Sequence, residues 1–232
     1  MARPRLILFD IDGTLLLSGP RVRELFAEAF EDTFGVEAPL DGVHFAGMTD
    51  RGIVRLLLER VGRPRSDGFE GDFARFGEAF ALRMEEVYPG CEGPYLMPGV
   101  HALLHALHED PSVILLAATG NLPRTARVKL ARFGLDHFLP HGAYGDAHEG
   151  RPGLFAHALE VARAELGWRG RPEEVWILGD TRADVEAARA VGCRILAVGT
   201  GILDHADLRE TGPDAWMADL GDTEAVLALL RT

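Results

Sequence analysis

The feature that most constrains the fold is a regular alternation of short apolar runs with helical patterns. Apolar runs bounded by turn residues occur at Leu6–Phe9, Val113–Ala117, Val175–Leu178, Ile195–Val198 and Ala215–Met217. Each run is typical of a buried strand of a parallel sheet. Helical patterns, with apolar residues every three to four positions, cover Val100–Leu107, Pro123–Phe133, Leu154–Leu166, Arg182–Val191 and Thr223–Leu230. The alternation predicts an α/β fold, a parallel sheet with helices on both faces.

The segment from Ser18 to about Pro98 breaks this alternation, because it has no convincing buried strand. Helical patterns within it cover Arg21–Phe34, Arg51–Val61 and Phe69–Val87. Gly-Pro and Pro-Gly pairs stand at both of its ends and indicate turns. We therefore predict a small all-helical cap, residues 18–95, inserted after the first strand into a core of residues 1–17 and 96–232. Such an insertion lies over the carboxyl ends of the strands, where open α/β sheets bind ligands.

The composition excludes several classes of protein. The chain has 232 residues, of which 47% are apolar and 26% charged, which is the profile of a globular protein. Its formal net charge of −12 opposes binding to nucleic acid, because that binding depends on basic side chains that neutralise phosphates. No segment approaches the roughly 20 apolar residues that span a bilayer. We therefore expect neither a nucleic-acid partner nor a membrane.

The expected compartment is the cytoplasm. Cys91 and Cys193 are far apart and lack metal-ligand spacing, which favours a reduced protein. The apolar run before Asp10 is too short for a signal peptide. Oligomeric state cannot be read from the pattern, so we take a monomer as the default and a homodimer as the alternative.

Two carboxylates follow the first apolar run. Asp10 and Asp12 can point the same way just past the strand end, because side chains on a strand alternate. A hard cation such as Mg²⁺ would relieve their repulsion. Gly13 and Thr14 allow a sharp turn and offer backbone N–H groups to an anion. The alternative is a simple turn in which the aspartates bond to nearby backbone.

Two further runs end in similar residues. Thr119, Gly120 and Asn121 follow one run and precede a helix start, so a hydroxyl and backbone amides could bind an oxyanion there. Asp180 ends another run, and Asp184 follows four positions later in the first turn of a helix. Helix capping is the alternative for both groups. Delivery of Asp, Thr and Asp to one rim by three strands favours a shared site.

A fourth, weaker signal is Arg151-Pro152 before a helical pattern. A cation at a helix start opposes the helix dipole, so this position is unfavourable unless the Arg has an anionic partner. Otherwise Arg151 is a solvated surface residue.

The stretches FDIDGTL, ATGN, Arg151-Pro152 and GDTRAD, in this order and spacing, resemble the four motifs of the haloacid dehalogenase superfamily of phosphohydrolases. The resemblance covers nearly the whole chain, and the helical insert looks like the family's C1-type cap. It implies a Rossmann-like core and a phosphoric monoester hydrolase nearest the phosphoglycolate phosphatase and β-phosphoglucomutase branch.

The resemblance also implies roles for the acidic residues. Asp10 would attack phosphorus and form an aspartyl-phosphate. Asp12 would be the general acid for the leaving alcohol and then the base for water, and a neighbouring carboxylate would raise its pKa to suit that task. Mg²⁺ would be held by Asp10, the Asp12 backbone carbonyl and Asp180, with Asp184 as a ligand or as a support.

Phosphoryl oxygens would be bound by Thr119 and the Gly120 amide, with Gly13, Thr14 and Asn121 in the phosphate-binding set. The third motif departs from the family, which usually has Lys where this chain has Arg151. Arg keeps the charge but is not interchangeable with Lys. Lys129, the only lysine of the chain, could be recruited instead, but we expect it at the surface and assign the role to Arg151.

The resemblance leaves the reaction open between two activities. A Mg²⁺-dependent phosphatase for small phosphorylated metabolites is preferred, and a sugar-phosphate mutase is the alternative. The loop FAGMTDRG offers Thr49, Asp50 and Arg51 to a substrate, and Arg51 could hold the distal phosphate that a mutase needs. The alternative is that Thr49 and Asp50 only cap a helix. Asp12 speaks against a dehalogenase, and the intact acidic residues speak against a purely binding role.

Overall fold

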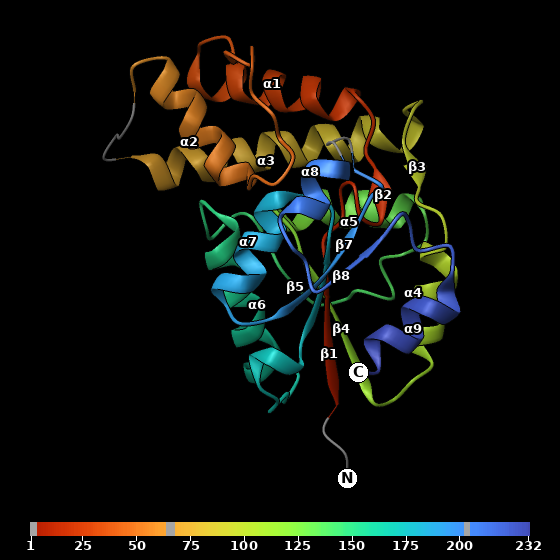
Figure 1. The fold of residues 1–232 in the computed structure, drawn as a ribbon. Helices are drawn as coiled ribbons and strands as arrows, with labels where there is room; N and C mark the ends of the chain where they lie inside the picture. Colours follow the sequence, from red (N-terminus) through yellow and green to blue (C-terminus); the bar gives the residue numbers. More distant parts are fainter. Residues whose placement is uncertain (1–3, 64–67, 202–204) are drawn as a thin grey trace.

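The protein contains one sheet of six parallel strands, in the order β5-β4-β1-β6-β7-β8 (Figure 1). The computed structural model describes residues 4–63, 68–201 and 205–232. The strands are β1 (Arg5–Phe9), β4 (Val113–Ala118), β5 (Gly142–Ala143), β6 (Trp176–Gly179), β7 (Arg194–Val198) and β8 (Ala215–Met217). The parallel sheet expected from the apolar runs is confirmed. β1 lies in its middle, where Phe9 pairs with Ala117 of β4 and with Leu178 of β6, so three strands end side by side.

Helices cover both faces of this sheet (Figure 1). One apolar layer is closed by α4 (Val100–His108), α5 (Pro123–Arg132) and α9 (Thr223–Leu230). The other is closed by α6 (Arg151–Ala164), α7 (Arg182–Ala190) and α8 (His205–Glu210). The alternation along β1 explains the two layers, since Ile7 and Phe9 belong to the first and Leu6 and Leu8 to the second.

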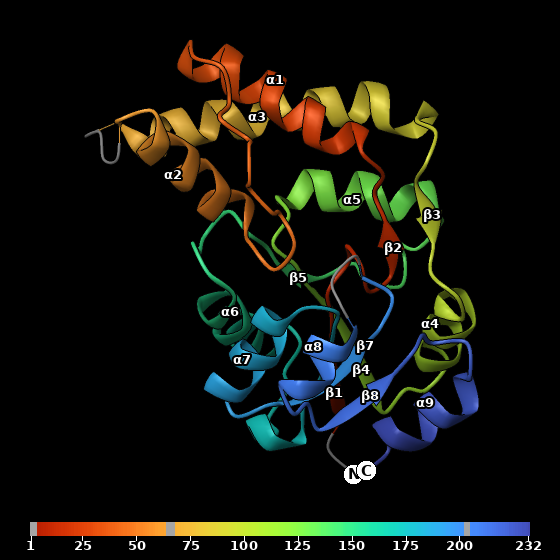
Figure 2. The same cartoon turned by 45° about the horizontal axis from the view of Figure 1, so that its top comes forward.

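A separate apolar cluster lies among α1 (Arg21–Phe34), α2 (Asp50–Arg60) and α3 (Phe69–Val87), as expected for a helical insert. Its centre is aromatic: the ring of Phe26 lies 4.8 Å from that of Phe76 and 5.2 Å from that of Phe80, centroid to centroid. Helix α5 lies between these helices and the sheet (Figure 2), and its residue Val128, together with Leu122 just before the helix, packs against the same cluster. Helix α5 is therefore covered on both sides.

The chain passes between the sheet and the helical insert through two short strands. β2 (Leu16–Leu17) pairs antiparallel with β3 (Tyr95–Leu96), and the 3₁₀ turn η1 (Tyr88–Gly90) precedes β3. The boundaries that we propose for the cap, after residue 17 and before residue 96, lie in this pair.

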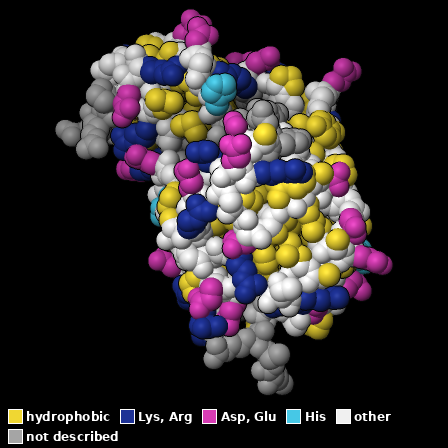
Figure 3. Space-filling view, viewed as in Figure 1, with side chains coloured by type: hydrophobic (Ala, Val, Ile, Leu, Met, Phe, Trp, Pro, Cys, Tyr) yellow, Lys and Arg dark blue, Asp and Glu magenta, His cyan; other side chains and the backbone are white. Residues whose placement is uncertain are grey.

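Some elements were not predicted. β2, β3 and β5 have two residues each, which is too few for a periodic signal. The 3₁₀ turn η2 (Pro172–Glu174), with three residues, is also too short. Helix α6 begins at Arg151 and not at Leu154, because Arg151 and Pro152 supply its first turn. Within the described ranges no helix is long and apolar enough to cross a membrane. On the face drawn in Figure 3, basic and acidic side chains alternate without a continuous basic patch.

Candidate active site

The site begins at the carboxyl end of β1. Asp10 directly follows the strand, and its backbone N–H donates to the Leu178 carbonyl of β6 at 3.0 Å. Its side chain is 1% exposed, and Oδ1 accepts from the Ile11 N–H at 2.8 Å. The second carboxylate oxygen remains for other partners, so the strand fixes Asp10 at the rim where three strands end.

Arg151 supplies one of those partners. Its Nη2 donates to Asp10 Oδ2 at 2.8 Å, and its Nη1 lies 3.4 Å from Asp184 Oδ1. Arg151 is 5% exposed, so the surface alternative considered for this residue does not hold. The first turn of α6 therefore places a cation against the acidic groups, which compensates for its unfavourable position on the helix dipole.

Lys129 is the second buried cation, and here the sequence-based expectation was wrong. It is 3% exposed and not at the surface. Its Nζ lies 2.7 Å from Asp12 Oδ2 and 2.5 Å from Asn121 Oδ1. Helix α5 packs between the cap cluster and the sheet, and the Lys129 ammonium is bonded to Asp12 and Asn121. Arg151 and Lys129 thus contact different carboxylates, Asp10 and Asp12, and neither replaces the other.

The surroundings of Asp12 also overturn the expected direction of its pKa. Burial is the largest single influence and acts to raise the pKa of this carboxyl, but the Lys129 ammonium and the hydrogen bonds from Lys129, Ser18 and Asn121 together outweigh it, so the pKa of Asp12 lies below its usual value. The sequence argument considered only the neighbouring carboxylate. In this arrangement Asp12 is ionised.

Three buried carboxylates form the other half of the site. Oxygen atoms of Asp10, Asp180 and Asp184 lie within 4.8 Å of one another. Burial, together with the Asp184 carboxylate, raises the pKa of Asp10 to about 6 although Arg151 opposes this. Burial and the neighbouring carboxylates of Asp184 and Asp10 raise the pKa of Asp180 well above its usual range. Closely spaced oxygen ligands with this excess of negative charge suit a hard divalent cation.

The packing around Asp180 supports the same reading. A Cβ on Gly13 would lie 2.1 Å from Asp180 Oδ2, and one on Gly201 would lie 1.9 Å from the same atom. Gly13 also has a φ of +82°, which disfavours any other residue. Thr14 donates to Asp180 Oδ1 at 3.3 Å. Two glycines thus leave room for the carboxylate at the end of β6.

Asp184 takes part in the cap of α7 and also belongs to the acidic cluster. Thr181 caps α7, and Asp184 Oδ2 accepts from the Thr181 N–H at 3.1 Å and from its hydroxyl at 2.6 Å. The other oxygen, Oδ1, is buried without a hydrogen bond, and it faces Arg151. An unbonded buried oxygen in this cluster is what a metal ligand requires.

The segment after β4 joins the site through a side-chain network. Asn121 Nδ2 donates to Asp12 Oδ2 and to Thr119 Oγ1, both at 2.7 Å. Helix α5 has no side-chain cap from its own N-cap residue, so capping does not account for Thr119 or Asn121. Gly120 lines the same cavity as Asp12, Gly13 and Asn121. Thr14 and Thr119 are fully buried beside it.

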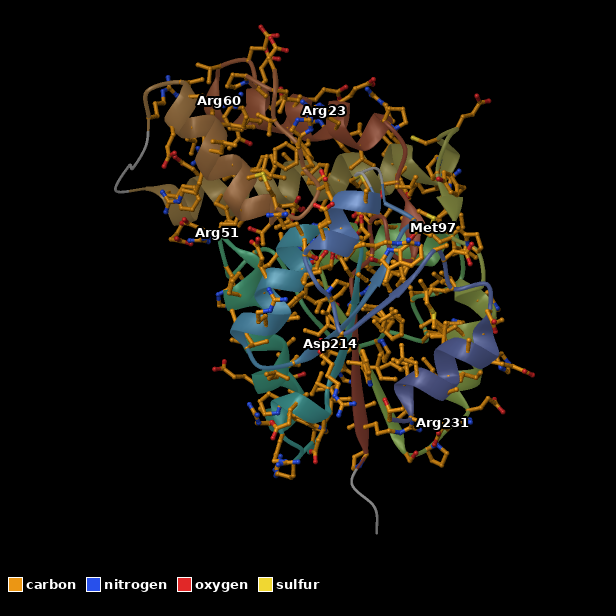
Figure 4. The ribbon with its side chains drawn as sticks, viewed as in Figure 1. Arg23, Arg51, Arg60, Met97, Asp214 and Arg231 are labelled. Carbon is orange, nitrogen blue, oxygen red and sulfur yellow. The ribbon has the colours of Figure 1, made fainter. Side chains whose placement is uncertain are left out.

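Two predicted substrate residues lie elsewhere. Thr49 is buried and accepts from the Gly52 N–H at 3.0 Å, so it caps α2, as the alternative interpretation held. Arg51 pairs with Glu70 and donates to the Asp146 carbonyl at 3.0 Å. Figure 4 shows Arg51 near the start of α2, apart from Arg23 on α1. Neither Thr49 nor Arg51 belongs to the cavity lining.

Sequence reasoning missed the core contact of one acidic residue and missed one glycine. Asp50 is 8% exposed, lines the cavity, and accepts from the Leu122 N–H at 2.8 Å. The sequence offered it as a cap-loop residue facing the substrate or as a helix cap, but its contact with Leu122 was missed because that partner is distant in sequence. Gly201 lies beyond the last motif and carries no local signal. For Lys129 a signal existed: Thr125 and Lys129 are four residues apart in the predicted helix and so share a helix face.

The charged rim opens into a cavity of about 560 Å³ between the strand ends and the cap. Asp12, Lys129, Arg151 and Asp180 line the core side. The cap loop borders it and is joined to the core, because the Asp50 N–H donates to the Gly120 carbonyl at 2.7 Å. This arrangement can hold a divalent cation and an anionic group beside Asp10.

Comparison with known proteins identifies the family of this chain. The sequence model of the haloacid dehalogenase-like hydrolase family matches residues 4–192. A phosphoglycolate phosphatase from Synechococcus elongatus is 31% identical over 97% of this chain and 98% of its own length.

Solved structures share the fold. A predicted phosphatase from Clostridium acetobutylicum matches with a TM-score of 0.70 at 17% identity, over 98% of this chain and 100% of that one. A β-phosphoglucomutase candidate from Thermotoga maritima matches with a TM-score of 0.60 at 23% identity, over 97% and 99%. Since the family match includes the strand ends that carry the carboxylates, this chain belongs to the haloacid dehalogenase-like hydrolases.

Proposed function

We propose that this chain is a Mg²⁺-dependent phosphatase that hydrolyses small phosphorylated metabolites through an aspartyl-phosphate intermediate. The observation that carries the proposal is the buried trio of Asp10, Asp180 and Asp184, with Arg151 against Asp10. The name of the Synechococcus elongatus relative supports a phosphatase of the phosphoglycolate phosphatase type.

In the first step an Asp10 oxygen attacks phosphorus. The bond between phosphorus and the ester oxygen breaks, and Asp12 gives the leaving alcohol a proton, which this ionised carboxylate first takes from the phosphate monoanion of the bound ester. In the second step water attacks the aspartyl-phosphate, Asp12 takes its proton, and the bond between phosphorus and Asp10 breaks to release inorganic phosphate. The ionised Asp12 beside Lys129 suits the second step, in which it is a base.

The proposed Mg²⁺ ligands are Asp10, the Asp12 backbone carbonyl and Asp180, with Asp184 as a ligand or a support. When bound, the cation would offset negative charge on the transferring phosphoryl group. Arg151 would neutralise a phosphoryl oxygen beside Asp10, and the Gly120 amide with Thr119 would bind another.

A mutase needs a second group for the distal phosphate, and Arg51 was the candidate. Its guanidinium is paired with Glu70 and packs over the Phe69 ring at 5.0 Å. It does not line the cavity. A phosphatase is therefore the activity that the geometry supports best.

The test is hydrolysis of p-nitrophenyl phosphate with and without Mg²⁺ by the wild type, Asp10→Asn and Asp136→Asn. Asp136 is exposed, so its substitution is a matched control. We expect Mg²⁺-dependent release that disappears only in Asp10→Asn, and a trapped acid-stable phosphate on Asp10 in the wild type after rapid quenching. No release from any ester by folded wild type would contradict the proposal. The cytoplasmic location and the monomeric state stay predictions; light scattering checks the second.

A further inference from the structure

We infer that the ester hydrolysed at this site carries an apolar organic group, and that the cap provides the surface that binds it. The inference rests on the proposed function and names the substrate class more closely. It predicts a preference for apolar esters over small acidic ones such as phosphoglycolate.

The cavity has two chemically different walls. The core wall carries the charged residues at the strand ends. The cap wall is apolar, with the side chains of Val22, Phe26, Val43, Phe45, Ile53 and Phe80. Phosphate chemistry needs only the first wall, so the second is available to the alcohol part of the ester.

The cations of the lining are already engaged. Among the described residues that line the cavity, Lys129 and Arg151 are paired with the site carboxylates, and Arg23 donates to two backbone carbonyls of the loop 40–43 at 2.5 and 2.7 Å. The remaining basic residue is His44, which is exposed. Among the described lining residues, a substrate with a second anionic group would therefore meet one guanidinium without a carboxylate partner, Arg23, and two hydrogen bonds hold that guanidinium against the loop 40–43.

Acidic residues of the lining add to this selectivity. Asp50 belongs to the cap side of the cavity, and its nearest positive group, the Leu122 N–H, is already bonded to it. Burial raises the pKa of Asp50 to about 7, so above that pH its carboxylate repels a substrate carboxylate beside it. An uncharged group has no such penalty.

The cavity volume is that found while the cap loop is in contact with the core. The loop after residue 45 is held by the Asp50 N–H on the Gly120 carbonyl at 2.7 Å and by the Arg51 N–H on the Gly145 carbonyl at 3.1 Å. The cavity of about 560 Å³ is thus not produced by an open cap. Pockets of about 300–1,000 Å³ hold ligands of drug size, whereas a two-carbon acid would leave most of this space to water.

The apolar wall is backed by a packed aromatic cluster. The Phe26 ring lies 5.0 Å from that of Phe45 and 5.2 Å from that of Phe80, both edge to face. Side chains fixed in this way bind an apolar group without much loss of their own freedom. Burial of each added methylene should then increase kcat/KM by about fourfold until the wall is filled.

The experiment is a series of phosphate monoesters of primary alcohols, which have similar leaving groups: ethyl, butyl, hexyl and 2-phenylethyl phosphate, with 2-phosphoglycolate beside them. We expect kcat/KM to rise at least tenfold from ethyl to butyl phosphate and to exceed that for 2-phosphoglycolate. A flat series, or 2-phosphoglycolate as the best substrate, would overturn the inference and leave the phosphatase intact. Failure of every ester, including p-nitrophenyl phosphate, would reject the proposed function instead.

Two matched variants locate the binding surface. Phe45 and Phe34 are both partly buried in the cap, but only Phe45 lines the cavity. Phe45→Ala should lower the ratio of kcat/KM for 2-phenylethyl over ethyl phosphate at least fivefold, and Phe34→Ala should keep this ratio within twofold of wild type. The ratio is measured on one preparation, so it does not depend on the folded fraction. An equal change in both variants, or none in Phe45→Ala, would contradict the assignment.

Discussion

Lys129 Nζ lies 2.7 Å from Asp12 Oδ2, which places the only lysine of the chain against the carboxylate that we assign to proton transfer. The lysine is almost fully buried, and an ammonium in such a place needs an anionic partner. Asn121 accepts a second hydrogen bond from it. The charge state of Asp12 and the position of α5 are therefore linked.

Replacement of Lys129 tests this link. Lys129→Met should raise the pKa of Asp12, because the ammonium that holds it low is removed. If the acidic limb of kcat/KM against pH reports Asp12, that limb should move to higher pH, while Lys129→Arg, which keeps the charge, should move it much less. The measurement is the pH–rate profile with p-nitrophenyl phosphate. An identical limb in Lys129→Met and the wild type would show that the pair does not set the profile.

Arg151 should have the larger effect on the chemical step. Arg151→Met removes the cation beside Asp10, and loss of such a charge-stabilising donor lowers kcat by roughly 10²–10³-fold. Arg127→Met, on the exposed face of α5, is the matched control and should retain wild-type kcat. Steady-state kinetics at saturating Mg²⁺ provide the comparison. Equal kcat in both variants would remove Arg151 from the phosphoryl site.

Mg²⁺ should stabilise the fold, because it binds carboxylates that repel one another only in the native state. At a hundredfold excess over Kd the gain is about 2.7 kcal/mol, or roughly 5–10 °C in Tm for a chain of this size. Asp180→Asn should lose most of this shift, and Asp136→Asn should keep it. Thermal scans with EDTA and with Mg²⁺ measure it without substrate, and equal shifts in the two variants would refute the assigned ligands.

Gly201 provides a second route to the same site. A methyl group at this position would overlap Asp180 Oδ2. Gly201→Ala should therefore displace that carboxylate and reduce the Mg²⁺-dependent Tm shift by at least half. Gly71→Ala, where a Cβ would meet nothing within 4 Å, is the control. A full shift in Gly201→Ala would mean that the contact with Asp180 relaxes easily.

Asp50 gives a stability effect that depends on pH. Burial raises its pKa from 3.8 to about 7, although Lys129 and the Leu122 N–H oppose this. The folded state thus keeps a proton that the unfolded state loses, so this residue lowers stability as pH rises from about 4 to about 7. The stability of Asp50→Asn relative to wild type should therefore increase over that range. At pH 8 the increase in the free energy of unfolding should reach roughly 2–4 kcal/mol.

Urea unfolding at pH 4, 5.5, 7 and 8 in EDTA measures this difference. Asn can still accept from the Leu122 N–H, so the hydrogen bond is retained. Asp136→Asn should show a difference from wild type that does not change with pH. A constant difference for Asp50→Asn as well would mean that Asp50 is not protonated in the folded state.

Much of the fold could be predicted because its signals are local. The strands of three or more residues coincide with apolar runs in the sequence. The long helices repeat their apolar residues every three to four positions. The rim that joins Asp10, Thr119 and Asp180 could be predicted for the same reason, since each follows such a run directly. Strands β2, β3 and β5 could not, because two residues contain no period.

The parts that escaped prediction depend on contacts between distant segments. Lys129 looked like a surface residue because burial of α5 on its outer side depends on the cap. Asp50 meets Leu122 only when the cap loop is seated on the core. The direction predicted for the pKa of Asp12 was wrong because the charge beside it, Lys129, lies 117 positions away in the sequence.

Because Lys129 is the only lysine and is buried, its chemical modification can report on motion of the protein. Amine-directed reagents that find exposed lysines on most proteins have one side-chain target here, and it is closed off by Asp12, Asn121 and the cap. The rate at which such a reagent modifies Lys129 therefore reports how often the cap lifts from α5, without any engineered label.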